Sequence, residues 1–342
     1  MRKIFILGLI FLTASLYAQK VTNAAFQQSG KKVEITYSLD KQADISVYVS
    51  TDGGKTFGSA LTAVTGDVGK QVAAGTNKRI VWSPLEERER LVSDNVVFKI
   101  VPSGGEKMTF TVAGVSFTMI KVEGGTFTMG CTSEQGSDCY DDEKPSHSVT
   151  LSDYYIGQTE VTQGLWKAVM GTNPSNFKSG DNYPVETVSW NDCQDFIKKL
   201  NSLLSSQLGG KRFALPTEAQ WEYAARGGKK SRGYKYSGSN TLSSVAWYND
   251  NSSSSTHAVA TKSANELGLY DMSGNVYEWC QDWYGSYSSS SQTNPSNSSS
   301  GSFRVFRGGS WNFHARRCRV SRRFYYAPTF CFYYFGLRLV LL

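Results

Sequence analysis

Apolar and polar positions alternate through the first third of the chain. The segments 31–39, 43–50, 78–83 and 95–102 all follow this pattern, with Gly, Asp and Asn residues between them. A period of two places neighbouring side chains on opposite faces of a strand, so each segment predicts a half-buried β-strand. Together they predict an all-β sandwich over residues 20–103.

After this unit the sequence consists of short motifs and has few long periodic runs. We predict a linker over residues 104–114 and a second domain over 115–342. Ser189 can cap a helix that buries one face, made of Trp190, Cys193, Phe196, Ile197 and Leu200. The stretch "TEAQ" at 217–220 is a capping box, followed by a second helix with Trp221, Ala224 and Ala225 on its buried face.

The first nineteen residues predict a signal peptide. Arg2 and Lys3 give a basic start, residues 4–12 are apolar, and residues 14–18 are small. The apolar run is too short to span a bilayer, and no later stretch reaches ~18 apolar residues. We therefore expect an exported protein without a membrane span, either secreted, periplasmic or on the cell surface.

Charge and cysteine are unevenly placed. The formal net charge is +7, and from Phe303 to the end there are eight arginines and no Asp or Glu. Six cysteines in an exported chain make disulfides plausible. Cys131 and Cys139 bracket a short polar loop and form the easiest local pair, whereas each of the other four cysteines could also be bridged.

Seven short motifs follow one another along the second domain. They are "VEGGTFTMG" (122–130), "TEVTQGLW" (159–166), "YPVETVSWND" (183–192), "LPTEAQWEYAARGG" (215–228), "GLYDMSGNVYEW" (268–279), "RGGSW" (307–311) and "GLRL" (336–339). In this order they resemble the formylglycine-generating enzyme family, also called sulfatase-modifying factors, over roughly residues 115–342. The resemblance implies an α+β fold of the C-type-lectin type with much irregular structure. The N-terminal sandwich, in turn, resembles the immunoglobulin-like architecture.

The resemblance also implies a structural calcium ion. The family holds Ca²⁺ through the side chains at the Asp271 and Glu278 positions and the carbonyl oxygens at Gly274 and Val276. Two carboxylates and two carbonyls suit a hard cation. The alternative is a turn closed by hydrogen bonds alone.

The family's oxidase activity requires two copper-binding thiolates, which lie two and seven residues after the Trp of the "GGSW" motif. Counted from Trp311, these positions are Phe313 and Cys318, so Cys318 is the only retained family cysteine. A single thiolate cannot form a two-sulfur Cu(I) site, and we expect no copper and no catalytic residues. The alternative is a formylglycine-generating copper oxidase that acts on a protein cysteine.

After Trp311 the chain contains no Lys, Gln, Glu, Met or Trp. In this respect the last forty residues resemble another group with this fold, the variable proteins of diversity-generating retroelements. In those proteins AAY codons are randomised to NNY, which never encodes these five residues. We therefore predict a variable ligand-binding region over about 304–340, made of Phe306, Phe313, His314, Arg317, Arg322, Phe324, Tyr325, Tyr326, Phe330, Phe332, Tyr333 and Tyr334.

Between these positions lies a predicted fixed frame. Its members are Arg304, Gly308, Gly309, Trp311, Ala315, Arg319, Pro328, Gly336 and Leu337. We expect the frame to lie inside and the variable residues to lie mostly exposed on one face. Such a face predicts a non-catalytic, monomeric binder of an unknown protein or cell-surface ligand rather than of nucleic acid. The alternatives are that the aromatic stretch forms a core β-strand or that it is a drifted, unselected tail.

Overall fold

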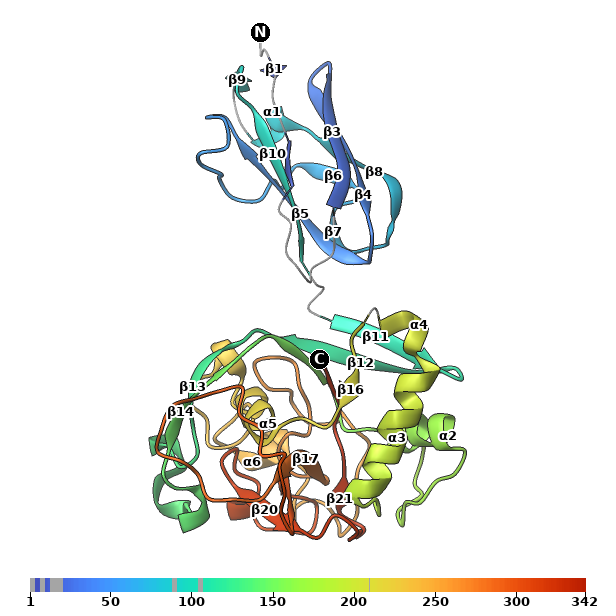
Figure 1. Cartoon of the computed structure of the whole chain (residues 1–342), viewed down its shortest axis with the longest axis vertical. Coiled ribbons are helices and arrows are strands. Elements are labelled where there is room, and N and C mark those ends of the chain that lie inside the picture. Colours follow the sequence, from blue (N-terminus) through green and yellow to red (C-terminus); the bar gives the residue numbers. More distant parts are fainter. Residues whose placement is uncertain (1–3, 7–9, 13–20, 88–90, 104–106, 209) are drawn as a thin grey trace. The chain divides into compact units, whose positions relative to one another are not determined.

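The computed structural model describes residues 4–6, 10–12, 21–87, 91–103, 107–208 and 210–342 (Figure 1). By its internal contacts the chain divides into two compact units, Met1–Glu106 and Lys107–Leu342. The division follows the change in sequence pattern. Each unit has its own hydrophobic core.

The described part of the N-terminal unit contains two four-stranded sheets and one two-stranded sheet. The strand orders are β3-β4-β8-β6, β2-β10-β5-β7 and β1-β9. The strands are β1 (Ile4–Ile6), β2 (Ile10–Leu12), β3 (Val21–Ser29), β4 (Lys32–Leu39), β5 (Ala43–Ser50), β6 (Val64–Gly66), β7 (Gly69–Val72), β8 (Gly75–Trp82), β9 (Leu91–Ser93) and β10 (Val97–Ser103). One core contains alternate residues of both four-stranded sheets, among them Ile35, Val47, Ile80 and Phe98. The four strands predicted from alternation are thus confirmed, and the unit also contains one short helix, α1 (Pro84–Glu87).

Two predicted segments fall partly outside the described residues. Of the predicted signal peptide, residues 1–3, 7–9 and 13–19 lie outside them, while β1 and β2 pair in parallel with β9 and β10. Of the predicted linker over 104–114, residues 104–106 lie outside them. The rest belongs to the second unit, because β11 (Lys107–Val112) pairs along its whole length with β12 (Val115–Val122).

The C-terminal unit contains three sheets joined by much irregular backbone. Their strand orders are β11-β12-β15-β22-β16, β13-β14-β18 and β20-β19-β17-β21. The further strands are β13 (Gly125–Met129), β14 (His147–Leu151), β15 (Tyr154–Gly157), β16 (Phe213–Ala214), β17 (Tyr277–Trp283), β18 (Gln292–Thr293), β19 (Arg304–Arg307), β20 (Arg323–Tyr326), β21 (Phe335–Gly336) and β22 (Val340–Leu341).

The helices begin where their capping residues predict. Ser189 and Asp192 form a capping box at the start of α3 (Trp190–Leu203), and Thr217 and Gln220 form one at the start of α5 (Glu218–Ala225). The unit also has α2 (Gln163–Met170), α4 (Ser205–Leu208), α6 (Leu242–Val245) and the 3₁₀ turns η1 (Ser133–Asp138), η2 (Asp141–Glu143), η3 (Gly228–Lys230) and η4 (Ala315–Arg317). The helix α5 packs against β13, β17 and β19, which places its acidic side chains beneath the predicted variable region. Within the described part of the chain, no helix is long and apolar enough to cross a membrane.

Candidate functional site

The predicted variable region is arranged around the sheet β20-β19-β17-β21. β19 pairs antiparallel with β17 and β20, and β21 pairs in parallel with β17. Residues 313–334 leave this sheet through η4, return through β20, and leave it again in the turn before β21. The sheet therefore brings three separate segments of the last forty residues to one region of the unit.

The aromatic side chains of these segments contact one another. Tyr325 and Tyr326 are 42% and 43% exposed, and the remaining rings are half-buried. Tyr326 lies 4.0 Å from Phe330 between ring centroids, and Phe332 lies 4.8 Å from Tyr334. We define the outer face as the predicted variable residues that are exposed or half-buried in the structure. These are Phe313, His314, Arg317, Arg322, Phe324, Tyr325, Tyr326, Phe330, Phe332, Tyr333 and Tyr334.

Phe306 does not belong to this face, which corrects its assignment to the ligand-binding set. It is only 5% exposed, because its position on β19 turns its ring toward the core. There it lies 4.8 Å from Tyr277 and 5.3 Å from Trp279 between ring centroids. Its outer neighbour is Phe324, which stacks on it at 5.6 Å and separates it from solvent.

Tyr277 is the buried centre of the rings. It is 1% exposed and contacts Phe306, Phe313, Phe324, Tyr334 and Phe335. Burial raises the pKa of its hydroxyl well above the ordinary value. The outer-face rings of Phe313, Phe324 and Tyr334 thus all contact this one buried ring.

Arginines lie among the exposed rings. Arg317 lies over Phe313 and Phe324, with 4.9 Å and 5.3 Å from its guanidinium carbon to the ring centroids. Arg322 lies 4.1 Å from the ring of Phe324 and forms an ion pair with Asp142. These distances suit cation–π contact.

The sequence analysis missed three aromatic residues that border the outer face. Tyr140 lies beneath Arg316 and Arg322, with 4.0 Å and 4.2 Å from its ring to their guanidinium carbons. Tyr284 and Phe303 contact Tyr325. Tyr140 directly follows the Cys131–Cys139 disulfide, which confirms the predicted local pair. Only this loop carried a sequence signal, and that signal concerned the disulfide.

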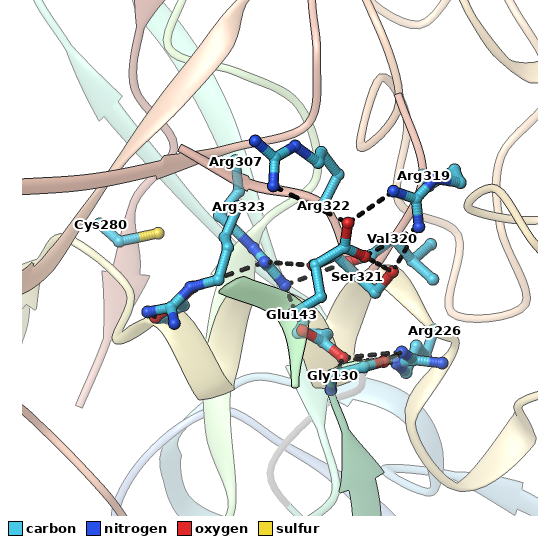
Figure 2. A network of polar contacts seen from close by, with 12 residues as sticks. Gly130, Glu143, Arg226, Cys280, Arg307, Arg319, Val320, Ser321, Arg322 and Arg323 are labelled. Carbon is cyan, nitrogen blue, oxygen red and sulfur yellow. Dashed lines mark hydrogen bonds and ion pairs between the residues drawn. The ribbon is translucent and has the colours of Figure 1, made fainter. Parts of the chain in front are cut away.

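The interior of the same region holds arginines bonded to buried glutamates (Figure 2). Each of four arginines is at most 2% exposed. We call these pairs the framework: Arg307 with Glu222, Arg319 with Glu143, Arg323 with Glu218, and Arg338 with Glu278. The glutamates come from η2, α5 and β17. The framework therefore ties the end of the chain to three earlier elements.

The Arg319–Glu143 pair shows how the framework is satisfied. The two guanidinium NH groups donate to the two carboxylate oxygens at 2.6 and 2.8 Å, and Ser321 donates to the same carboxylate at 2.6 Å. Burial by itself would raise the pKa of Glu143, but the bonds from Arg319 and Ser321 outweigh it and hold the pKa below its usual range. In Figure 2, Arg322 also points toward this carboxylate.

The predicted frame residues lie inside, with two exceptions. Trp311 is 6% exposed and Leu337 is fully buried, whereas Ala315 and Pro328 are half-buried. Gly309 has a φ of +78°, and a Cβ built on it would lie 2.5 Å from the Cys318 sulfur. Only glycine fits there without strain. The "GGSW" motif thus fixes the backbone on which the outer face stands.

The retained family cysteine is enclosed. Cys318 is fully buried, and burial raises its pKa to about 12. Position 313, where the family's other copper ligand would lie, carries a half-buried Phe ring in contact with Tyr277 and Tyr334. Cys193 and Cys280 are also buried, and Cys331 is exposed.

The predicted calcium turn contains a group of buried carboxylates. Asp271 is 2% exposed and its Oδ1 has no hydrogen-bond partner among the described residues. Both oxygens of Glu278 accept from Arg338, and Oε2 also accepts from the Trp221 indole NH. Burial raises the pKa of Asp271 to about 6; burial and the neighbouring carboxylates raise the pKa of Glu160.

The fit of this turn to calcium is partial. Asp271 offers a free oxygen, whereas Glu278 is already shared with Arg338. No cluster of three His, Cys, Asp or Glu side chains suited to a metal occurs in the described part of the chain. The carbonyls of Gly274 and Val276 would have to complete the ligand set.

Comparison with known proteins gives consistent matches. Residues 110–341 match the sulfatase-modifying factor enzyme 1-like domain. Chaperone protein LppX of Paenibacillus barcinonensis is 37% identical over 252 residues, which cover 60% of this chain and 83% of the relative. Formylglycine-generating enzyme of Streptomyces coelicolor is 29% identical over 268 residues, covering 59% and 81%. The structure of Treponema denticola variable protein 1 is 36% identical with a TM-score of 0.62, covering 68% of this chain and 98% of that protein.

Proposed function

The chain belongs to the sulfatase-modifying factor family, and on this premise we propose that its C-terminal unit is a non-catalytic scaffold that displays a diversified ligand-binding surface. The outer face is the binding surface in this proposal. Similarity to a protein described as variable supports it, since that similarity extends over two-thirds of the chain.

One observation carries the proposal: the residues predicted to vary lie toward the surface, whereas most of the predicted frame residues lie inside. Eleven of the twelve positions predicted to vary are exposed or half-buried, and their rings contact one another and the buried rings beneath them, such as Tyr277 and Phe335. The arginines, Trp311 and the glycines between them are held by buried ion pairs and close packing. A surface that accepts random residues must be separable from the core, because core substitutions cost several kcal/mol each (~2–5).

The identity of residue 313 argues against the family's copper chemistry here. Phe313 supplies no ligand, and the buried Cys318 would give only one sulfur where linear Cu(I) coordination needs two. Its raised pKa also disfavours the thiolate that binds metal.

The remaining parts of the proposal concern the setting of this surface. We place the protein outside the cytoplasm as a monomer, with the N-terminal unit as an immunoglobulin-like spacer. We also propose that Asp271 and Glu278, with the carbonyls of Gly274 and Val276, hold a structural Ca²⁺. Such an ion would bind the Asp271 Oδ1, which has no hydrogen-bond partner among the described residues.

The DNA beside the gene tests the proposal. We expect an imperfect repeat of codons 304–340 nearby, with AAY codons where this chain has its outer-face residues, together with a reverse-transcriptase gene. The codons of the frame residues, among them Trp311 and Arg319, should be identical in both copies. A neighbourhood with neither repeat nor reverse transcriptase would contradict diversification.

A further inference from the structure

The arginines at the end of the chain differ in whether a carboxylate neutralises them. The four framework arginines bond to buried glutamates, and Arg322 pairs with Asp142. Arg316 and Arg317 are exposed, and among the described residues no carboxylate oxygen lies within 4.0 Å of either. Two adjacent arginines, Arg317 of the outer face and its neighbour Arg316, thus have no carboxylate partner of their own at ion-pair distance.

Local contacts hold both of these side chains in place. Arg316 lies over Tyr140 and its Nε donates to the Asp138 carbonyl oxygen at 2.9 Å. Arg317 lies over the rings of Phe313 and Phe324. Ring contacts of this kind reduce the side-chain motion that binding would otherwise have to restrict. A guanidinium is also weakly hydrated and presents a planar fork of donors that matches a carboxylate.

The charged groups around Arg316 and Arg317 do not cancel the positive charge of this pair. His314 is exposed, and its Nδ1 lies 3.9 Å from a carboxylate oxygen of Asp250. Asp142 is paired with Arg322, and Asp138 is paired with Lys235. Charge complementarity therefore favours a negatively charged partner at this edge of the face.

The rings beside the pair require apolar contact as well. Tyr326, Phe330, Phe332 and Tyr334 form one connected group of ring contacts. Nucleic-acid bases stack on free, open ring faces, but these rings pack against each other and against Phe335. A protein segment can present apolar side chains to the rings and carboxylates to the arginines at the same time.

We propose that the outer face selects an acidic protein segment whose Asp or Glu carboxylates meet Arg316 and Arg317 while its apolar side chains cover the neighbouring rings. This inference rests on the proposed binding function and specifies the chemistry of the partner. Charged hydrogen bonds supply orientation, and the rings supply most of the buried area.

A random-peptide display library panned against the full chain tests this inference. We expect the retained peptides to be enriched in Asp and Glu over the input library. An enriched peptide should bind the R316S/R317S variant at least roughly tenfold more weakly, because the loss of either one of the two charged hydrogen bonds would already account for that factor. The matched control is K198S/K199S, which removes two adjacent exposed charges from α3 and should leave affinity unchanged.

The outcomes separate this inference from the proposed function. Retained peptides that are neutral or basic, or that bind R316S/R317S as tightly as the parent, would overturn the acidic partner and leave a binding surface. Heparin or a single-stranded oligonucleotide that binds more tightly than the acidic peptides would overturn the choice of a protein partner. If no peptide is held above the level of a variant with Tyr325, Tyr326, Tyr333 and Tyr334 changed to Ser, the binding surface itself is contradicted.

Discussion

The framework and the outer face come from the same forty residues and have opposite surroundings. Each framework arginine is fixed by a carboxylate from a distant part of the chain, such as Glu143 for Arg319. Outer-face rings are held by apolar contacts with one another and with buried rings such as Tyr277. The difference shows how a chain can keep its fold while changing its surface, because the obligatory partners all lie on the inner side.

Cysteine reactivity gives the largest expected contrast between the two regions. Cys318 lies inside and Cys331 on the outside. Because burial raises the pKa of Cys318 from 9.0 to about 12, its thiolate fraction near pH 8 is roughly a thousandfold lower than without the shift. We expect iodoacetamide to label Cys331 of the native protein and to label Cys318, Cys193 and Cys280 only after unfolding.

The sign of the pH effect follows from the raised pKa. Native Cys318 should gain reactivity only as pH rises toward 12, and mass spectrometry of labelled peptides would follow it. Rapid labelling of Cys318 at pH 8 would show that the interior opens to solvent, and it would restore the case for metal chemistry there.

Removing one framework partner should give the largest loss of stability. Arg319→Ala leaves Glu143 buried without its guanidinium, and breaking a buried ion pair in this way costs about 3–5 kcal/mol. Arg316→Ala, three residues earlier, removes an exposed arginine and should stay within ~0.5 kcal/mol. Chemical denaturation of both variants compares them directly. Equal losses would contradict the division into inside and outside.

Calcium removal should give a smaller effect. If the turn at Asp271 binds Ca²⁺, an excess of one hundred times Kd contributes about 2.7 kcal/mol to stability, and a chelator removes it. The melting temperature should then fall, whereas Asp271→Asn should melt at one temperature with or without chelator. An unchanged melting curve of the parent protein would remove calcium from the account and leave the framework intact.

Local patterns predicted much of the fold from the sequence. Alternation identified four strands of the N-terminal unit, and the capping residues Ser189 and Thr217 marked the starts of α3 and α5. Both signals act over a few residues. The short strands β16, β18 and β21 have only two residues each, so no period could reveal them, and long-range pairing defines them.

The sequence predicted which residues make up the candidate site better than it predicted how deeply each of them is buried. The absence of five residue types after Trp311 and the order of the motifs singled out the segment. Neither could show that Phe306 faces inward, because its burial depends on its β19 register against β17. Nor could they show that the arginines bond to Glu143 and Glu218, which lie more than a hundred residues away.

The central claim is that the outer face can change without loss of the fold. The unfolding free energy of the variant with Tyr325, Tyr326, Tyr333 and Tyr334 all changed to Ser tests it most directly. Because these rings are exposed or half-buried, we expect a total loss below about 2 kcal/mol, which is less than the loss for Arg319→Ala alone. An unfolded C-terminal unit would show instead that these rings form the core.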